Sequence, residues 1–343
     1  MTAPIRLAFT MGDPAGIGPE ITAKATRQMA ELVRQGLAEF IVLGSAQALH
    51  EAEQRMGLAP DDNGRPFYRM VDVGPVETPV VTGQISAVGG EWAYRAVAKA
   101  VALVQAGEAD AIVTGPLSKE ALHLAGHHFE GHTEMLAHLT GQRDAVMMLA
   151  HDDMHVTHVT THCALADVPK RITPLRLRRV FDVTHQALRT LGIEQPRIAV
   201  AGLNPHCGEG GILGKEDDEI VAPVVREYAD RGFSGPWPGD TVFIKLRARQ
   251  FDAVVAMFHD QGHIPVKLMG FQVDPATGAW QAISGVNITL GLPILRTSVD
   301  HGTAFDIAGK GVANANSLVE AAEYAFKLIK GQRAVQAAAG VAA

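Results

Sequence analysis

The chain has 343 residues, of which 47% are hydrophobic and 20% are charged. These proportions are typical of globular proteins and exclude a disordered chain, a collagen and a coiled coil. With 30 basic and 37 acidic side chains, the formal net charge is −7. A nucleic-acid partner is therefore not expected, because neutralising phosphates requires a basic surface. At roughly 150 residues per domain, the length predicts two domains or one large one.

Short apolar segments rich in β-branched residues alternate with longer segments of helical period. This alternation predicts an α/β fold in which parallel strands are covered by helices on both faces. The predicted strands are 5–10, 40–43, 70–73, 111–114, 145–149, 155–160, 198–201 and 253–257. The predicted helices are 19–35, 91–105, 173–191, 217–231 and 317–336. Ser317 is expected to cap the last helix, with Glu320 completing a capping box.

Cellular location is indicated by what the sequence does not contain. Cys163 and Cys207 are its two cysteines, too few for a disulfide framework. The first residues lack the charged, apolar and small-residue regions of a signal peptide. No apolar run reaches the roughly 18 residues that a membrane span requires. We therefore expect a cytoplasmic protein without a membrane partner.

A glycine-rich loop at 12–20 follows the first predicted strand and leads into a helix. Its glycines allow positive φ and close backbone approach, and the helix N-terminus carries partial positive charge. The loop therefore suits an anionic ligand. It is neither a P-loop, because no Gly-Lys-Ser/Thr follows, nor a regular Gly-x-Gly-x-x-Gly loop. A tight structural turn is an equally good interpretation.

Three histidines, His162, His206 and His259, lie at the ends of predicted apolar strands. Their wide separations in the sequence are not those of a zinc finger. Side chains at strand ends meet where the strands share a sheet edge, and three ligands leave a metal ion open to substrate, as in catalytic sites. A single strand-end histidine is more often simply hydrogen-bonded, and the chain has 15 histidines.

His263 follows His259 by four residues, the spacing that places two histidines on one face of a helix in many zinc proteins. Gly262 and Pro265 disfavour a regular helix in this segment. We therefore do not expect His263 to be a metal ligand.

Basic and polar residues in three other segments suit an anionic substrate. His132 and Thr133 follow a glycine at an expected helix start, whose N–H groups favour a phosphate or carboxylate. Lys267 and Arg296 each follow an apolar segment, and a buried cation needs a partner. That partner is either an anionic ligand or an internal carboxylate, for which Asp300 is near enough to Arg296 in sequence.

Seven motifs then point to one family. They are Gly12-Asp-Pro-Ala-Gly-Ile-Gly-Pro-Glu20, Gly131-His-Thr-Glu134, Thr160-Thr-His162, Leu203-Asn-Pro-His206 with Gly208-Glu-Gly-Gly211, His259-Asp-Gln-Gly262, Val286-Asn-Ile-Thr-Leu-Gly-Leu-Pro293 and Arg296-Thr-Ser-Val-Asp-His-Gly302. Together they resemble the 4-hydroxythreonine-4-phosphate dehydrogenase family, in the family's order and over residues 5 to about 330.

The resemblance implies a fold similar to isocitrate and isopropylmalate dehydrogenases, with two α/β/α domains and a cleft between them. We expect the first domain at about 1–135 plus 290–343. The second, with the dimer interface and the metal histidines, is expected at about 136–289. The resemblance also implies a homodimer whose active site draws on both subunits.

The resemblance further implies roles for individual residues. The implied metal ligands are His162, His206 and His259. The implied substrate-binding residues are His132, Thr133, Lys267, Asn287 and Arg296. Asp240 matches an acidic position near the metal and is the candidate for an acid/base role or for orienting a ligand. Residues 300–314 resemble the adenine-side loop of isopropylmalate dehydrogenases, which makes His301 and Asn314 the nucleotide-binding candidates.

The implied reaction is the oxidation of 4-phosphohydroxy-L-threonine by NAD or NADP, followed by decarboxylation of the β-keto acid, as in pyridoxal 5'-phosphate biosynthesis. A divalent ion (zinc, magnesium or cobalt) would lower the pKa of the substrate hydroxyl and stabilise the alkoxide. The small phosphorylated hydroxy acid is thus the expected partner of the site.

Two departures favour another branch of the family. The connection 270–285 is longer than in the biosynthetic enzymes, and 259–267 looks more like the catabolic branch, which acts on D-threonate or D-erythronate 4-phosphate. An aromatic-acid cis-dihydrodiol dehydrogenase and a metal-dependent phosphohydrolase are less favoured alternatives.

Overall fold

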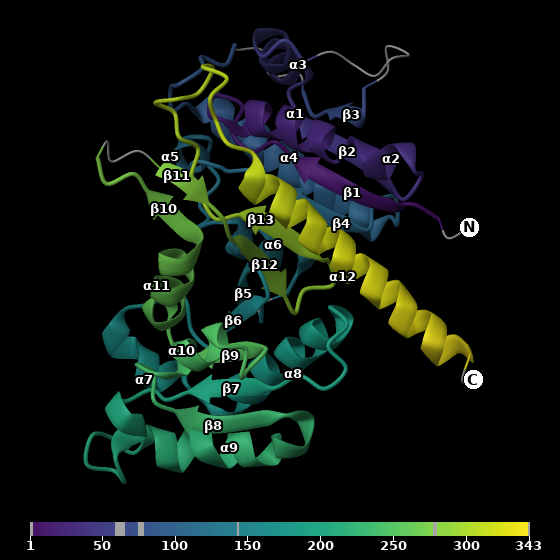
Figure 1. Ribbon diagram of the computed structural model, residues 1–343. Helices are drawn as coiled ribbons and strands as arrows, with labels where there is room; N and C mark the ends of the chain where they lie inside the picture. Colours follow the sequence, from purple (N-terminus) through teal and green to yellow (C-terminus); the bar gives the residue numbers. More distant parts are fainter. Residues whose placement is uncertain (1–2, 59–65, 75–78, 143, 277–279, 342–343) are drawn as a thin grey trace. The chain divides into compact units, whose positions relative to one another are not determined.

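The computed structural model describes residues 3–58, 66–74, 79–142, 144–276 and 280–341, and the chain divides into two compact units (Figure 1). Unit 1 comprises Met1–Arg143 and Leu292–Lys330, and unit 2 comprises Asp144–Gly291 and Gly331–Ala343. Each unit combines a sheet with helices, so the α/β class expected from the sequence is confirmed. None of the described helices is long and apolar enough to cross a membrane.

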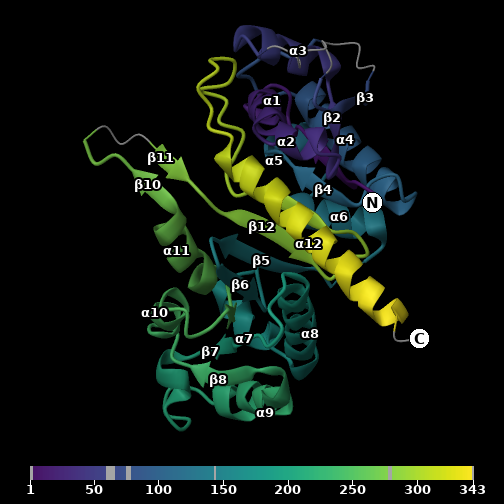
Figure 2. The same ribbon diagram turned by 45° about the vertical axis from the view of Figure 1, so that its right-hand side comes forward.

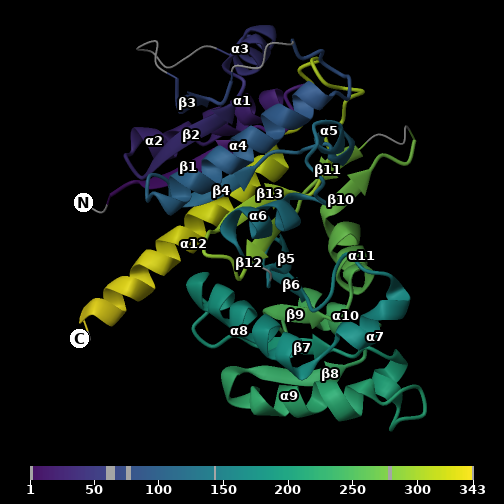
Figure 3. The ribbon, with the colours of Figure 1, turned by 180° about the vertical axis from the view of Figure 1, so that it is seen from behind.

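Five parallel strands form the sheet of unit 1, in the order β3-β2-β1-β4-β13. Their bounds are β1 (Ile5–Thr10), β2 (Ala38–Gly44), β3 (Arg69–Asp72), β4 (Ala111–Thr114) and β13 (Arg296–Val299). Helix α4 (Ala87–Gln105) and residues 316–330 of α12 (Asn316–Val341) lie on opposite faces of this sheet (Figures 1 and 3). This double cover explains why nearly all residues of β1, β2 and β4 are buried.

Smaller helices complete unit 1 at the strand ends: α1 (Gly18–Gln28), α2 (Ala30–Arg34), α3 (Ala46–Arg55), α5 (Lys119–Leu124) and α6 (His132–Thr140). The helix predicted over 19–35 is thus interrupted between α1 and α2. Helices α3, α4 and α5 begin where a serine hydroxyl accepts a backbone N–H three residues later, which satisfies one exposed donor of each helix.

The capping box predicted at Ser317 is wrong. Helix α12 begins at Asn316, and the side-chain oxygen of Asn314 accepts the N–H of Asn316 at 2.8 Å. The Ser317 hydroxyl accepts the backbone N–H of Asp300 instead, at 3.4 Å. An asparagine two residues before the helix therefore takes the place of the expected serine cap.

Unit 2 has a mixed sheet in the order β12-β5-β6-β9-β7-β8. The strands are β5 (Val146–His151), β6 (Met154–His158), β7 (Ile198–Ala201), β8 (Phe233–Trp237), β9 (Ala253–Ala256) and β12 (Val286–Leu290). The expectation of parallel strands is wrong for β5, which runs antiparallel to both β6 and β12. Only Asp152 and Asp153 join β5 to β6, and a parallel crossover needs a dozen or more residues.

The helices of unit 2 are α7 (Val168–Arg171), α8 (Pro174–Thr190), α9 (Ala222–Glu227), α10 (Val242–Arg247) and α11 (His259–Gly270). Helix α8 packs on β12, β5 and β6, and α11 packs on β5, β6 and β9. The helix predicted over 217–231 consists of a π-helical turn (Asp217–Val221), α9 and a 3-10 turn (Ala229–Arg231).

The long connection 270–285 contains an antiparallel hairpin. Strands β10 (Phe271–Val273) and β11 (Trp280–Ile283) pair directly after α11, which leads into the hairpin (Figure 2). Residues 277–279 of this connection lie outside the described residues.

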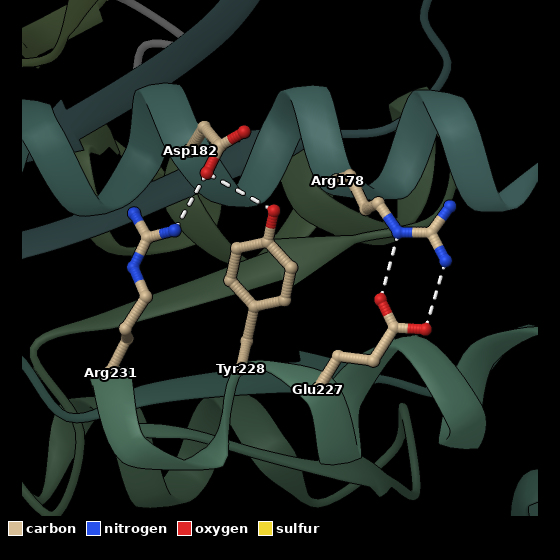
Figure 4. A network of polar contacts seen from close by, with 5 residues as sticks. All are labelled: Arg178, Asp182, Glu227, Tyr228 and Arg231. Atoms are coloured by element: carbon tan, nitrogen blue, oxygen red, sulfur yellow. Dashed lines mark hydrogen bonds and ion pairs between the residues drawn. The ribbon is translucent and has the colours of Figure 1, made fainter.

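A polar network joins α8 to the last residue of α9 and to the segment that follows it (Figure 4). Arg178 donates two 2.8 Å hydrogen bonds to Glu227, and Asp182 accepts from Tyr228 at 3.1 Å and from Arg231 at 2.7 Å. Exposed ion pairs of this kind contribute little to stability. The Tyr228 ring also packs edge-on against Phe181, so buried aromatic contact supports the same junction.

Close approach of α4 and α5 depends on Gly90, because a Cβ atom there would lie 2.0 Å from the carbonyl oxygen of Ala121. We expect Gly90→Ala to lower the free energy of unfolding by roughly 1–3 kcal/mol, the usual cost of overpacking. The midpoint of guanidinium denaturation measures this loss. The matched control is Gly340→Ala in α12, which meets no atom within 4 Å and should not lower the midpoint. Equal midpoints in the two variants would contradict the packing account.

Candidate functional site

The carboxyl ends of three parallel strands in unit 2 carry the predicted metal ligands. His162 follows β6, His259 begins α11 after the two residues that follow β9, and His206 lies in the loop after β7. Strand β9 lies between β6 and β7, so these three ends share one edge of the sheet. The ring centroids of His162 and His259 are 5.6 Å apart. Within the described part of the chain, the ligand atoms of His162, His206 and His259 do not all lie within 4.8 Å of one another.

The His206 loop has an unusual backbone. His206 has a φ of 52° and Glu209 a φ of 46°, a left-handed conformation that non-glycine residues rarely adopt. The buried carboxylate of Asp217 holds the start of this loop by accepting the backbone N–H groups of Leu203 at 2.7 Å and Asn204 at 2.9 Å. Charge-assisted bonds of this kind are strong enough to fix a strained loop.

Gln261 ties the start of α11 to the same loop. Its side-chain oxygen accepts the N–H of Met257 at 2.7 Å, and its amide nitrogen donates to the carbonyl of Gly202 at 2.8 Å. The turn that carries His259 is thereby fixed next to the end of β7. Sequence reasoning missed both Gln261 and Asp217, which lie in the first turn of α11 and at the start of the π-helical turn Asp217–Val221.

His259 is oriented for binding a cation through one nitrogen. Its Nδ1 atom bonds to the Asp260 carboxylate at 2.7 Å, which assigns the proton to Nδ1 and leaves the Nε2 lone pair as the ligand atom. Histidine ligands of metals usually donate their other N–H in this way, which raises their basicity. Imidazole donors fit zinc and cobalt, so the residues present suit a divalent ion.

Helix α11 corrects one expectation from the sequence. It is continuous from His259 to Gly270 although it contains Gly262 and Pro265, so the prediction that these residues prevent a helix is wrong. Gly262 is required by packing, because a Cβ atom there would lie 2.3 Å from Nε2 of His158. Tertiary contact therefore outweighs helix propensity. As a result, His263 stacks on His259 with ring centroids 3.6 Å apart.

Asp240 is exposed and lies in the turn before α10. Its charge acts at the His206 loop, where it contributes to the raised pKa of Cys207. Burial of the thiol is the largest cause, followed by the charges of Asp217, Asp218 and Asp240, and together they raise this pKa to about 11. The Cys207 thiol is therefore protonated at neutral pH. The acid/base or orienting role of Asp240 stays a prediction.

Unit 1 brings together three residues of the expected anion site. Arg296, on β13, is 3% exposed and donates from Nε and Nη2 to the Thr114 hydroxyl at 3.0 and 2.7 Å. Burial lowers the pKa of Arg296 to about 9, and the Glu134 charge opposes that shift. Burial, and then the Arg296 charge, hold the pKa of His132 well below its usual value. A fixed cation thus lies near a neutral imidazole at the start of α6, with Thr133 next along the helix.

His132 has a nitrogen available for a ligand, because its buried Nε2 has no hydrogen-bond partner within the described residues. In unit 2, the Oδ1 atom of Asn287 on β12 is likewise buried without a partner in that part of the chain. The ammonium of Lys267, on α11, lies 4.8 Å from the centroid of the Phe271 ring. Substrate-binding roles for these residues stay predictions.

The two nucleotide-binding candidates lie in unit 1. His301 donates from Nδ1 to the carbonyl of Gly302 at 3.0 Å. The side-chain oxygen of Asn314 accepts a hydrogen bond from the N–H of Asn316, as described for the start of α12. Its amide nitrogen is the atom that could still donate to a ligand.

The glycine-rich loop 12–20 contains two buried carboxylates. Asp13 is fully buried and accepts the N–H of Ala15 at 2.9 Å, and burial raises its pKa to about 6. Both carboxylate oxygens of Glu20 are buried without a partner within the described residues. Gly12, with a φ of 74°, allows the loop to meet Pro116. These buried acidic groups favour the structural turn over an anion site.

Comparison with known proteins identifies the family. The family model for pyridoxal phosphate biosynthetic protein PdxA matches residues 25–325. A Bradyrhizobium diazoefficiens protein provisionally named D-threonate 4-phosphate dehydrogenase is 57% identical over 96% of this chain and 98% of its own length. A Beijerinckia indica protein named 4-hydroxythreonine-4-phosphate dehydrogenase is 44% identical over 94% of each chain.

The solved structures agree with this result. The crystal structure of a 4-hydroxythreonine-4-phosphate dehydrogenase from Burkholderia phymatum matches with a TM-score of 0.76 and 40% identity, over 95% of this chain and 99% of the other. The chain belongs to the PdxA family of pyridoxal phosphate biosynthetic proteins.

Burial of Asp13 predicts a pH dependence of stability. Its pKa is about 6 in the folded chain, against an ordinary value of 3.8 for an aspartate, so the folded state binds the proton more tightly. Stability should therefore fall as the pH rises from about 4 through about 6, by roughly 3 kcal/mol. In Asp13→Asn, which keeps the acceptor for the Ala15 N–H, this fall should be absent. Parallel urea-denaturation profiles for wild type and variant across that range would contradict the assignment.

Proposed function

We propose that this chain is an NAD- or NADP-dependent dehydrogenase that requires a divalent ion and acts on a 4-phosphorylated 3-hydroxy acid, with decarboxylation of the β-keto product. The observation that carries the proposal is the pair of imidazoles at the ends of β6 and β9, with His259 oriented by Asp260. Membership of the PdxA family supports it. The names of two relatives, each a dehydrogenase of a 4-phosphorylated substrate, agree with this chemistry.

His162, His206 and His259 are proposed to hold the ion through their imidazole nitrogens. A bound divalent ion, zinc, magnesium or cobalt, supplies the Lewis acidity that lowers the pKa of a substrate hydroxyl. Asp260 keeps the Nδ1 proton of His259 in place, so that Nε2 remains a lone-pair donor. Asp240, an exposed carboxylate whose charge acts at the His206 loop, is proposed to accept a proton or to orient a ligand.

Substrate anchoring is proposed for His132, Thr133, Lys267, Asn287 and Arg296. Arg296 is suited to a phosphate or carboxylate because its fork is fixed by Thr114 and it stays protonated at neutral pH. His132 presents an unpartnered nitrogen beside this charge. Fixed groups of this kind hold the substrate in a reactive orientation without further ordering cost.

The remaining features of the proposal concern cofactor, assembly and location. His301 and Asn314 are proposed to contact the nucleotide, and the chain to form a cytoplasmic homodimer with a shared active site. Ile264 and Leu268, one helical turn apart on α11, are 64% and 81% exposed, which supports an apolar contact with a second copy. Units 1 and 2 are proposed as the two domains of the chain.

Two substrates are supported. 4-Phosphohydroxy-L-threonine is the first candidate, in line with the family description. D-Threonate 4-phosphate is the second, supported by segment 259–267 and by the name of the 57% identical relative. Comparing kcat/KM for these two, D-erythronate 4-phosphate and a terephthalate dihydrodiol, with NAD and with NADP, ranks them. Release of phosphate without nicotinamide reduction would contradict the proposal and indicate a phosphohydrolase.

Removal of a metal histidine should remove the activity but not the fold. We expect His162→Ala and His259→Ala each to lose Co²⁺ binding in calorimetry and metal-dependent reduction of NAD, with an unchanged circular dichroism spectrum. His50→Ala, which replaces an exposed histidine of unit 1, should keep both. Near-normal rates in chelator-treated wild type would show that the metal assignment is wrong.

Arg296→Lys should raise the KM for the phosphorylated substrate about tenfold or more, because an ammonium cannot keep the Thr114 bonds and also present a fork to an anion. Each charge-assisted contact is worth about 1.5–3 kcal/mol. The control is Arg197→Lys, at an arginine that pairs with Asp252 at 2.7 Å. Steady-state kinetics test this expectation. An unchanged KM together with a lowered melting temperature would assign Arg296 to internal pairing alone.

A further inference from the structure

A row of four imidazoles runs from the metal-site edge of unit 2 into its core. The ring centroids of His162 and His259 are 5.6 Å apart, those of His259 and His263 are 3.6 Å apart, and those of His263 and His158 are 4.7 Å apart. The row starts at the exposed His162 and ends at the fully buried His158 on β6.

The two inner rings of the row are fixed by their surroundings. His263 is 6% exposed and donates from Nδ1 to the carbonyl of His259 at 2.9 Å. His158 is fully buried and donates from Nδ1 to the carbonyl of Met147 at 3.4 Å. Gly262 leaves no Cβ atom between α11 and His158, so the helix lies directly on that ring. The inner pair therefore forms a rigid base.

The His259 ring lies flat on this base, because the planes of His259 and His263 differ by only 10°. Its other restraint is the bond to Asp260, whose side chain is 72% exposed. Water competes for an exposed carboxylate, and a bond at Nδ1 alone does not fix the tilt of the ring about that bond. The buried face of His263 supplies the missing restraint.

We propose that His263 is a positioning residue for the metal site: its ring, seated on His158, sets the plane in which His259 presents Nε2. This inference rests on the proposed function, since it takes His259 as a metal ligand. It gives a role to a residue that the sequence analysis did not expect to be a metal ligand, because Gly262 and Pro265 disfavoured a helix there. Groups that orient a metal ligand from behind commonly change metal affinity 10–100-fold when they are replaced.

Two substitutions at His263 distinguish the effect of its flat ring from the effect of its ring nitrogens. His263→Leu removes the flat surface, whereas His263→Phe keeps an aromatic ring that can stack on His259 but has no nitrogen. The matched control is His155→Leu, since His155 is a buried histidine of β6 whose Nδ1 bonds to the Asp252 carbonyl. It undergoes the same loss of a buried ring outside the row.

Calorimetric titration with Co²⁺, together with the visible spectrum of the bound ion, measures affinity and coordination geometry independently of activity. We expect His263→Leu to weaken Co²⁺ binding about 10–100-fold and to alter the spectrum. His263→Phe should stay closer to wild type than to His263→Leu, and His155→Leu should bind Co²⁺ like wild type. Wild-type affinity in His263→Leu, or equal losses in the Leu and Phe variants, would overturn the proposal.

A measurement on the metal-free protein covers the case in which His263→Leu does not fold. A stacked ring shifts the NMR signals of its neighbour upfield, so the ring protons of His259 should move downfield in His263→Ala and stay near their wild-type positions in His263→Phe. Unchanged signals in His263→Ala would overturn the proposal. If instead the proposed function is wrong, wild type itself will bind no Co²⁺, and this result distinguishes that failure from failure of the His263 inference.

Discussion

The absence of a side chain at Gly262 is the constraint on which the arrangement of His158, His263 and His259 depends. A Cβ atom there would lie 2.3 Å from the His158 ring, so α11 can lie against β6 only because this residue is glycine. That approach brings His263 onto His158. Within the same helix, His259 stacks on His263, and its ring centroid lies 5.6 Å from that of His162. Gln261 then ties the same helix start to the end of β7. One close contact in the core therefore positions side chains at the surface.

The main feature of unit 1 is a buried cation, the guanidinium of Arg296. Arg296 loses its water on β13 and is held by the Thr114 hydroxyl, while the charge of Glu134 favours its protonated state. Burial, and then the Arg296 charge, keep the pKa of His132 low. The result is one fixed positive charge next to a neutral hydrogen-bonding ring, an arrangement that favours an anionic group over a neutral one.

Much of this arrangement follows from local sequence, and the rest depends on packing. The alternation of apolar and helical segments predicted the α/β class and strands such as Ile5–Thr10 and Ala111–Thr114 with their observed bounds. It did not predict the antiparallel β5, because direction is set by the short Asp152–Asp153 connection. The continuity of α11 was also missed, because helix-propensity rules penalise Gly262 and Pro265 and take no account of the His158 ring that packs against Gly262. Asp217 was missed because its partners are backbone N–H groups, which leave no pattern in side-chain spacing.

The carboxyl ends of β6 and β9 are proposed to form a divalent-metal site. A crystal structure of the protein grown with Co²⁺, with anomalous scattering recorded at the cobalt absorption edge, tests it most directly. The expected result is an anomalous peak bonded to Nε2 of His259 and to the imidazole of His162. A peak elsewhere, or no peak at this edge of the sheet in a cobalt-saturated crystal, would contradict it.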